Sequence, residues 1–130
     1  VLASLVIASQ WMAHTPPIVG EAGQPLPNSI ATLEKVRLGG VDQWLIVRGH
    51  DSNKPVLLFL SGGPGGSEAG RVLRFNQELE KHFVVVIWEQ RGCGKSLPLA
   101  EIENNDTWRI VEDIERLRRH RAREHHGQAD

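Results

Sequence analysis

Two short apolar runs constrain the fold of this chain more than any other feature of its sequence. Residues 55–60 read PVLLFL, and residues 82–88 read HFVVVIW. Both runs are too short for a buried helix, and neither alternates with polar residues, so each predicts a strand that is covered on both faces. We therefore expect two inner strands of a sheet with helices packed on it.

The segment between the two runs predicts a helix. Within residues 67–81 (SEAGRVLRFNQELEK), Val72, Phe75 and Leu79 recur at intervals of three and four, and polar residues fill most other positions. A strand, a helix and a second strand make a βαβ unit, whose strands run parallel.

Two further elements flank this unit. Residues 30–48 contain the runs IATLEKVRL and VDQWLIVR, joined by Gly39-Gly40, a dipeptide that suits the tight turn of a β-hairpin. Near the other end of the chain, Asn105 or Asp106 can cap a second helix. The apolar face expected for that helix consists of Ile110, Ile114 and Leu117, with Trp108 and Val111 beside it.

The order hairpin, strand, helix, strand, helix predicts an α/β fold, with an antiparallel hairpin followed by parallel inner strands. The predicted organisation has four parts. Residues 1–13 are an apolar segment, residues 14–28 a linker with four prolines, residues 29–118 the domain, and residues 119–130 a polar tail without a packed element. No internal repeat is visible.

The apolar segment 1–13 (VLASLVIASQWMA) allows two interpretations. It is shorter than the roughly 20 residues of a membrane-spanning helix, and it lacks the basic region of a signal peptide. It is either a remnant of a membrane anchor, giving membrane association through residues 1–13, or an apolar segment that packs on the domain. A cytoplasmic and a membrane-anchored location therefore both remain open.

Charge and cysteine content exclude several classes of protein. The net charge of −1 argues against nucleic-acid binding, which requires a basic field, so the arginines between residues 116 and 123 are interpreted as a solvated helix face or tail. A single cysteine, Cys93, excludes a disulfide framework and a multi-cysteine metal site. No two histidines have the i, i+4 spacing of a helical metal site, so we expect neither a metal nor another cofactor.

The loops that follow the two predicted inner strands have unusual compositions. The first is SGGPGGS (residues 61–67), and the second is EQRGCGKS (residues 89–96). A glycine-rich loop lets backbone N–H groups converge on an oxyanion or a phosphate. Gly94-Lys95-Ser96 is not a phosphate-binding P-loop, because Glu89 stands where that motif needs glycine. Gly63 and Gly65 start a dinucleotide motif that Glu68 interrupts.

Three ordered segments resemble the prolyl iminopeptidase branch of the α/β-hydrolases: VLLFLSGGPGGSE, FVVVIWEQRGCGKS and NNDTWRIVEDIERLR. In that family one strand ends in His-Gly-Gly-Pro-Gly and the next in Asp-Gln-Arg-Gly-x-Gly-x-Ser, and a helix containing Asp-Ile-Glu follows. The resemblance covers residues 29–118. It implies a serine hydrolase that cleaves an amide or ester bond in a peptide or small substrate.

The resemblance also implies roles for individual residues. Gly62 and Gly63 would supply or shape an oxyanion hole, and Pro64 and Gly65 would hold that loop in place. The segment comprising Glu89, Gln90, Arg91 and Gly92 would form a structural turn beside the site. Within this turn, Glu89 and Arg91 are expected to brace the two loops against each other rather than to act in catalysis.

The sequence departs from the family at two points. Ser61 replaces the histidine at the head of the glycine-rich loop, and the nucleophile motif Gly-x-Ser-x-Gly is absent. The catalytic serine, aspartate and histidine are therefore expected beyond residue 130, so that the chain is a truncated fragment without turnover of its own. The alternatives are a non-catalytic binding module, which uses the glycine loop or a free sheet edge, and a Rossmann-like nucleotide binder with Glu89 on the ribose.

Overall fold

A four-stranded mixed sheet organises the chain in the computed structural model, which describes residues 14–61, 66–99 and 106–127. The strands are β1 (Ile30–Leu38), β2 (Val41–Gly49), β3 (Val56–Leu60) and β4 (Val84–Glu89), and their order across the sheet is β1-β2-β4-β3. β1 and β2 form the predicted antiparallel hairpin, with Leu38 opposite Val41. β3 and β4 are parallel, as predicted.

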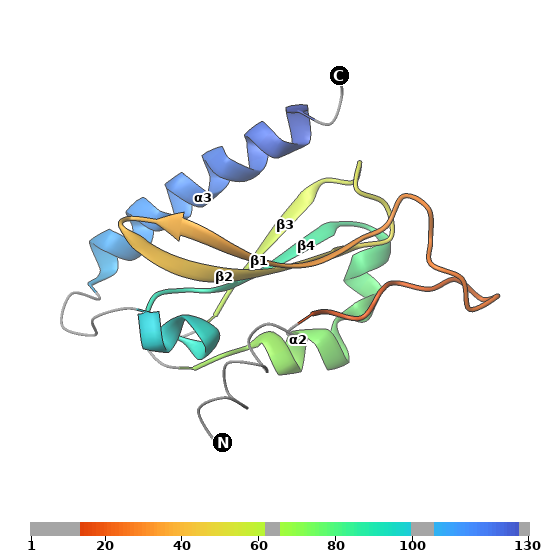
Figure 1. The fold of residues 1–130 in the computed structure, drawn as a ribbon, viewed down its shortest axis with the longest axis horizontal. Helices are drawn as coiled ribbons and strands as arrows, with labels where there is room; N and C mark the ends of the chain where they lie inside the picture. The colour runs from red at the N-terminus through yellow and green to blue at the C-terminus, as the bar shows by residue number, and fades with distance from the viewer. Residues whose placement is uncertain (1–13, 62–65, 100–105, 128–130) are drawn as a thin grey trace, which may run out of the picture.

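β4 is the centre of the fold. All six of its residues are buried, because β2 and β3 lie on its two sides and helices cover both faces (Figure 1). Its side chains alternate between two cores. One core lies under the helix α3 (Thr107–Gly127) and contains Leu38, Leu45, Val47, Val84, Val86, Trp88 and Leu117. The other lies under the helix α2 (Ala69–Phe75) and contains Ile46, Ala69, Val72, Val85 and Ile87.

β3 was predicted to be an inner strand, but it lies at an edge of the sheet. Among the described residues it pairs only with β4, so it is the edge strand of this sheet. Val56 and Leu60 are 42% and 49% exposed, although the run contains no polar residue. An apolar run indicates that a strand tolerates burial on both faces. How much of it is buried depends on which strands and helices pack against it.

The predicted helix over residues 67–81 is divided into two shorter elements. α2 spans Ala69–Phe75, and a 3₁₀ helix, η1, spans Gln77–Lys81. Asn76 separates them with φ −115° and ψ 19°, outside the helical region, while its N–H still donates to the Val72 carbonyl. Val72 is buried as predicted, but Phe75, the last residue of α2, is 72% exposed.

The second helix, α3 (Thr107–Gly127), confirms the prediction at its start and on its apolar face. The carboxylate Oδ1 of Asp106 accepts a hydrogen bond from the Arg109 N–H at 2.9 Å, which is the geometry of a helix N-cap. Leu117 is buried under the sheet, and Ile110 and Ile114 pack beside it, whereas Trp108 and Val111, expected beside this face, are 78% and 50% exposed.

We expect Asp106→Ala to lower the free energy of unfolding by about 1 kcal/mol, because it removes the acceptor for the Arg109 N–H. Asp106→Asn is the matched control, since asparagine is an equally good N-cap and should lose much less. Urea denaturation of both variants measures the difference. Equal losses in the two variants would show that the cap does not contribute.

The segment predicted as a polar tail without a packed element is instead helical up to residue 127. Neighbouring turns of this part of α3 are joined by ion pairs, such as that between Arg119 and Glu115 at 2.8 Å. Arg121 is only 12% exposed and reaches β1, where its Nη1 donates to Glu34 at 3.1 Å. The prediction failed because it counted only apolar residues, whereas i, i+4 charge pairs and a packed arginine stem also stabilise a helix.

Residues 14–28 contain no helix or strand, only an isolated bridge between Val19 and Pro25. They are nevertheless attached to the sheet, because Arg48 on β2 donates to Thr15 Oγ1 and to the Pro16 carbonyl, both at 2.6 Å. The apolar segment 1–13 lies outside the described residues. None of the helices in the described part of the chain is long and apolar enough to span a membrane.

Candidate functional site

The two candidate loops begin at the same edge of the sheet. β3 and β4 are parallel, with Leu60 opposite Trp88, so both loops leave from the carboxyl ends of neighbouring strands, where α/β proteins form their sites. Gly62, Gly63, Pro64 and Gly65 of the first loop lie outside the described residues. Their proposed role at an oxyanion therefore stays a prediction.

The second loop is a tight, buried turn. The Cys93 N–H donates to the Gln90 carbonyl at 2.9 Å, and Gly92 has φ +72°. Glu89, Gln90 and Arg91 are all 5% exposed or less, although all three are polar. Buried polar groups require hydrogen-bond partners. Those partners define what the turn holds together.

Glu89 connects the turn to the residues that follow the first loop. Its carboxylate Oε1 accepts a hydrogen bond from the Ser67 hydroxyl, and its Oε2 accepts one from the Lys95 N–H at 2.7 Å. Its backbone carbonyl accepts a hydrogen bond from the Ser96 hydroxyl at 2.5 Å. Ser96 in turn accepts one from the Trp44 N–H at 2.9 Å, which fixes the turn to β2.

Cys93 makes a second connection to the same segment. Its thiol is fully buried and donates to the Gly66 carbonyl at 2.8 Å. Burial raises the pKa of the Cys93 thiol, and the nearby charge of Glu89 raises it further, while the neighbouring Ser61 hydroxyl acts in the opposite direction. The thiol form is therefore favoured, which fits a donor to a carbonyl and not a nucleophile.

Arg91 makes its described contacts on the opposite face of the sheet. Its Nε and Nη2 donate to Asp113 Oδ2 on α3 at 2.9 and 2.7 Å, and both side chains are almost fully buried. Its backbone N–H donates to Gln43 Oε1 at 2.9 Å. Arg91 thus braces the second loop against α3 and the hairpin, whereas the contact with the first loop's exit comes from Glu89.

The sequence analysis missed Gln43 and Asp113, which complete this buried network. Gln43 lies on β2 and is fully buried; its Nε2 donates to Asp113 Oδ2 at 2.8 Å, and its Oε1 also accepts from the Trp88 indole N–H at 2.9 Å. A lone glutamine in a strand gives no sequence signal. Asp113 belongs to the helical motif quoted above, but its partners are distant in the sequence.

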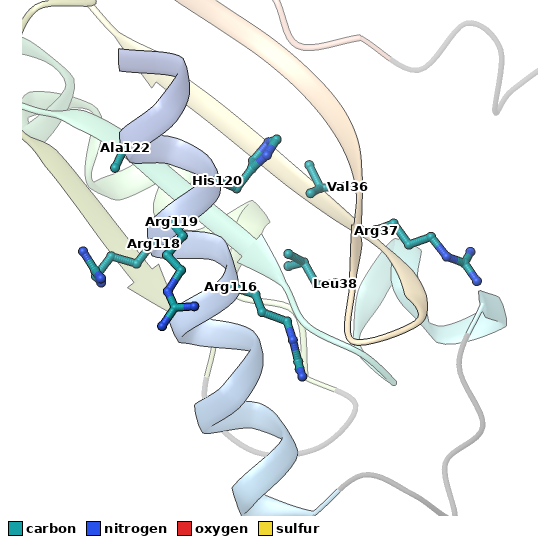
Figure 2. A pocket seen from close by; sticks show the side chains of 8 residues that line it. All are labelled: Val36, Arg37, Leu38, Arg116, Arg118, Arg119, His120 and Ala122. Carbon is teal, nitrogen blue, oxygen red and sulfur yellow. The ribbon is translucent and has the colours of Figure 1, made fainter. Parts of the chain in front are cut away.

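A pocket of about 570 Å³ lies between α3 and the end of the hairpin (Figure 2). It is rich in cations, but neighbouring carboxylates match them. Arg37 pairs with Asp42 at 3.0 Å. Arg118 and Arg119 both donate hydrogen bonds to Glu115. These bonds, first that of Arg118 and then that of Arg119, lower the pKa of Glu115 to about 2. The pocket lies on the α3 side of the sheet and none of its lining residues belongs to either loop, so we do not place the site there.

Three possible metal ligands meet at the edge of this region. The donor atoms of Glu34, His120 and Glu124 lie within 4.8 Å of one another. His120 and Glu124 have i, i+4 spacing, which the sequence analysis considered only for pairs of histidines. Arg121 already occupies the cation position, because its Nη1 contacts Glu34 at 3.1 Å and Glu124 at 2.5 Å. The cluster is therefore an ion-pair contact between α3 and β1, in which the Arg121 guanidinium bridges the two carboxylates.

The fold and the two loops are those of an α/β protein, with helices on both faces of the sheet and a candidate site at the carboxyl ends of parallel strands. Residues 55–129 match the family model for the alpha/beta hydrolase fold. The chain belongs to the α/β-hydrolase fold family. No solved structure matches it significantly.

Individual relatives point to one branch of that family. The chain is 44% identical over 72 residues to a probable aminopeptidase of Bacillus subtilis, covering 55% of this chain and 23% of the relative. Identity is 43% over 72 residues to a proline iminopeptidase of Xanthomonas citri (55% and 22%), and 46% over 72 residues to one of Arabidopsis thaliana (55% and 18%). The chain spans about a fifth of the length of these relatives.

Proposed function

We propose that this chain supplies the oxyanion-loop part of a serine hydrolase of proline iminopeptidase type, which releases an N-terminal residue from a peptide. The similarity to aminopeptidases and proline iminopeptidases carries this proposal. The hydrolase interpretation is also favoured over the Rossmann-like alternative by the family match. Within the described residues, Glu89 is engaged with Ser67 and Lys95, which leaves it no obvious role as a ribose ligand.

In the proposed mechanism, the chain's contribution is electrostatic. A serine from outside residues 1–130 attacks the scissile carbonyl while a histidine takes its proton, and the carbonyl oxygen becomes an oxyanion. The backbone N–H groups of Gly62 and Gly63 would donate to that oxyanion. The oxyanion then collapses and the C–N bond breaks as the histidine returns the proton to the leaving amine. Water hydrolyses the resulting acyl-serine, which releases the N-terminal residue and restores the serine. One donor to the oxyanion contributes about 10²–10³-fold to the rate in characterised serine hydrolases.

Ser67, at the exit of the first loop, and Ser96, in the second loop, fit structural roles better than a nucleophilic role. The Ser67 hydroxyl donates to the Glu89 carboxylate, and the Ser96 hydroxyl donates to the Glu89 carbonyl. An activated serine instead donates to a general base that accepts its proton during attack, most often a histidine. Neither hydroxyl is part of a Gly-x-Ser-x-Gly motif.

The proposal predicts that the 130-residue chain incorporates no fluorophosphonate, a reagent that labels activated serines covalently. Mass spectrometry of the intact chain measures the incorporation, with heat-denatured chain as the control. Stoichiometric labelling at Ser61, Ser67 or Ser96 would contradict the proposed role. A longer product of the same gene that contains Gly-x-Ser-x-Gly should be labelled and should release proline from proline β-naphthylamide. If the longer product were neither labelled nor able to release proline, the assignment to a serine hydrolase of proline iminopeptidase type would be contradicted.

A further inference from the structure

We propose that Glu89 is a positioning residue that fixes the exit of the glycine-rich loop to the turn after β4. The role assigned to that loop rests on the proposed function, whereas the contact itself does not. Glu89 ends β4, and the segment it holds, residues 66–69, connects the glycine-rich loop to α2. Its carboxylate would thus determine where the loop leaves the edge of the sheet.

Both oxygens of the Glu89 carboxylate are used in this contact. On the turn, the Lys95 N–H donates to Oε2 at 2.7 Å. At the loop exit, the Ser67 hydroxyl donates to Oε1. Ser67 Oγ also accepts from the Ala69 N–H at 3.3 Å, at the first residue of α2. One hydroxyl therefore links the carboxylate to the start of the helix.

The turn is shaped to receive this carboxylate. Gly94 has φ +48°, and a Cβ placed on it would lie 1.5 Å from Glu89 Oε2, so any side chain there would displace the carboxylate. Gly94 thus allows the backbone to approach Glu89 closely enough for the Lys95 N–H to donate. Because Ser96 fixes the same turn to β2, Glu89 is the rigid partner in its bond with Ser67.

The donor and acceptor pattern indicates positioning rather than proton transfer. A backbone N–H and a hydroxyl both point to the carboxylate, and Glu89 is 3% exposed. An ionised carboxylate accepts both hydrogen bonds and donates none. The parallel bond from Cys93 to the Gly66 carbonyl holds the preceding residue, so the loop exit is attached to the turn at two successive positions.

Amide hydrogen exchange of the Ala69 N–H in the 130-residue chain tests the proposal. We expect Glu89→Ala and Ser67→Ala each to raise its exchange rate about tenfold, equivalent to roughly 1.4 kcal/mol, and the double variant to raise it no further. Glu89→Gln should restore slow exchange to within about threefold of wild type, because its carbonyl accepts from Lys95 while its amide donates to Ser67. Glu78→Ala, in an exposed ion pair with Lys81, is the control.

Three outcomes would overturn the proposal. These are additive effects of the two single variants, failure of Glu89→Gln to restore slow exchange, and an equal rise of exchange at Val86 and Ile87 in the core of β4. The last outcome would show general loss of stability instead of local release. Because no substrate is present, these outcomes are independent of fluorophosphonate labelling and of proline release, so failure of either proposal can be recognised separately.

Discussion

Replacing Asp113 with alanine is expected to lower the free energy of unfolding by about 3–5 kcal/mol, because it removes one partner of a buried ion pair. Asp113 is fully buried, and its Oδ2 accepts hydrogen bonds from Arg91 and Gln43. Its Oδ1 accepts one from Arg116. Since Arg91 is only 4% exposed, water cannot replace the lost carboxylate without local unfolding.

Glu112→Ala is the matched control for this prediction. Glu112 precedes Asp113 on α3 and also pairs with Arg116, but both side chains of that pair are exposed, so its loss should cost less than about 1 kcal/mol. Urea denaturation followed by circular dichroism compares the two variants. A loss of 3–5 kcal/mol can exceed the stability of a small domain, so a largely unfolded Asp113→Ala chain also agrees with the prediction. A loss below about 1 kcal/mol would contradict it.

Much of the fold could be predicted because its signals are local. Gly39-Gly40 between the runs IATLEKVRL and VDQWLIVR specified the hairpin, and the spacing of Ile110, Ile114 and Leu117 specified the buried face of α3. The position of β3 at the edge could not be predicted in this way. Its five apolar residues show a preference for burial, but the neighbour on its second side is a property of the whole sheet.

The candidate site was predicted less completely. The motif placed Glu89 and Arg91 correctly at the end of a strand, but their partners are distant along the chain: Gln43 lies 48 residues before Arg91, and Asp113 lies 22 residues after it. No periodicity encodes such a pairing. The expected contact with the exit of the first loop is present for Glu89, through Ser67. For Arg91, whose described partners lie on α3 and the hairpin, a contact with residues 62–65 stays a prediction.

Gly39→Ala should cost far more stability than Gly40→Ala, although both glycines belong to the same turn. Both have positive φ, +56° and +82°, so alanine brings about 1–2 kcal/mol of backbone strain at either position. A Cβ on Gly40 would meet no atom within 4 Å. A Cβ on Gly39 would lie 2.4 Å from Asp113 Oδ1 and 2.5 Å from Arg91 Nη2.

The additional cost at Gly39 should be about 1–3 kcal/mol, the range for overpacking a close-packed interior, because the buried ion pair has to move. Urea denaturation of both variants isolates this difference, since the strain common to the two glycines cancels. If the difference arises from the ion pair, it should shrink in an Arg91→Met, Asp113→Leu background, where neither partner of the buried pair remains to be displaced. Equal losses for Gly39→Ala and Gly40→Ala would show that the hairpin turn and the buried network are independent, and that Arg91 does not brace the second loop against the turn.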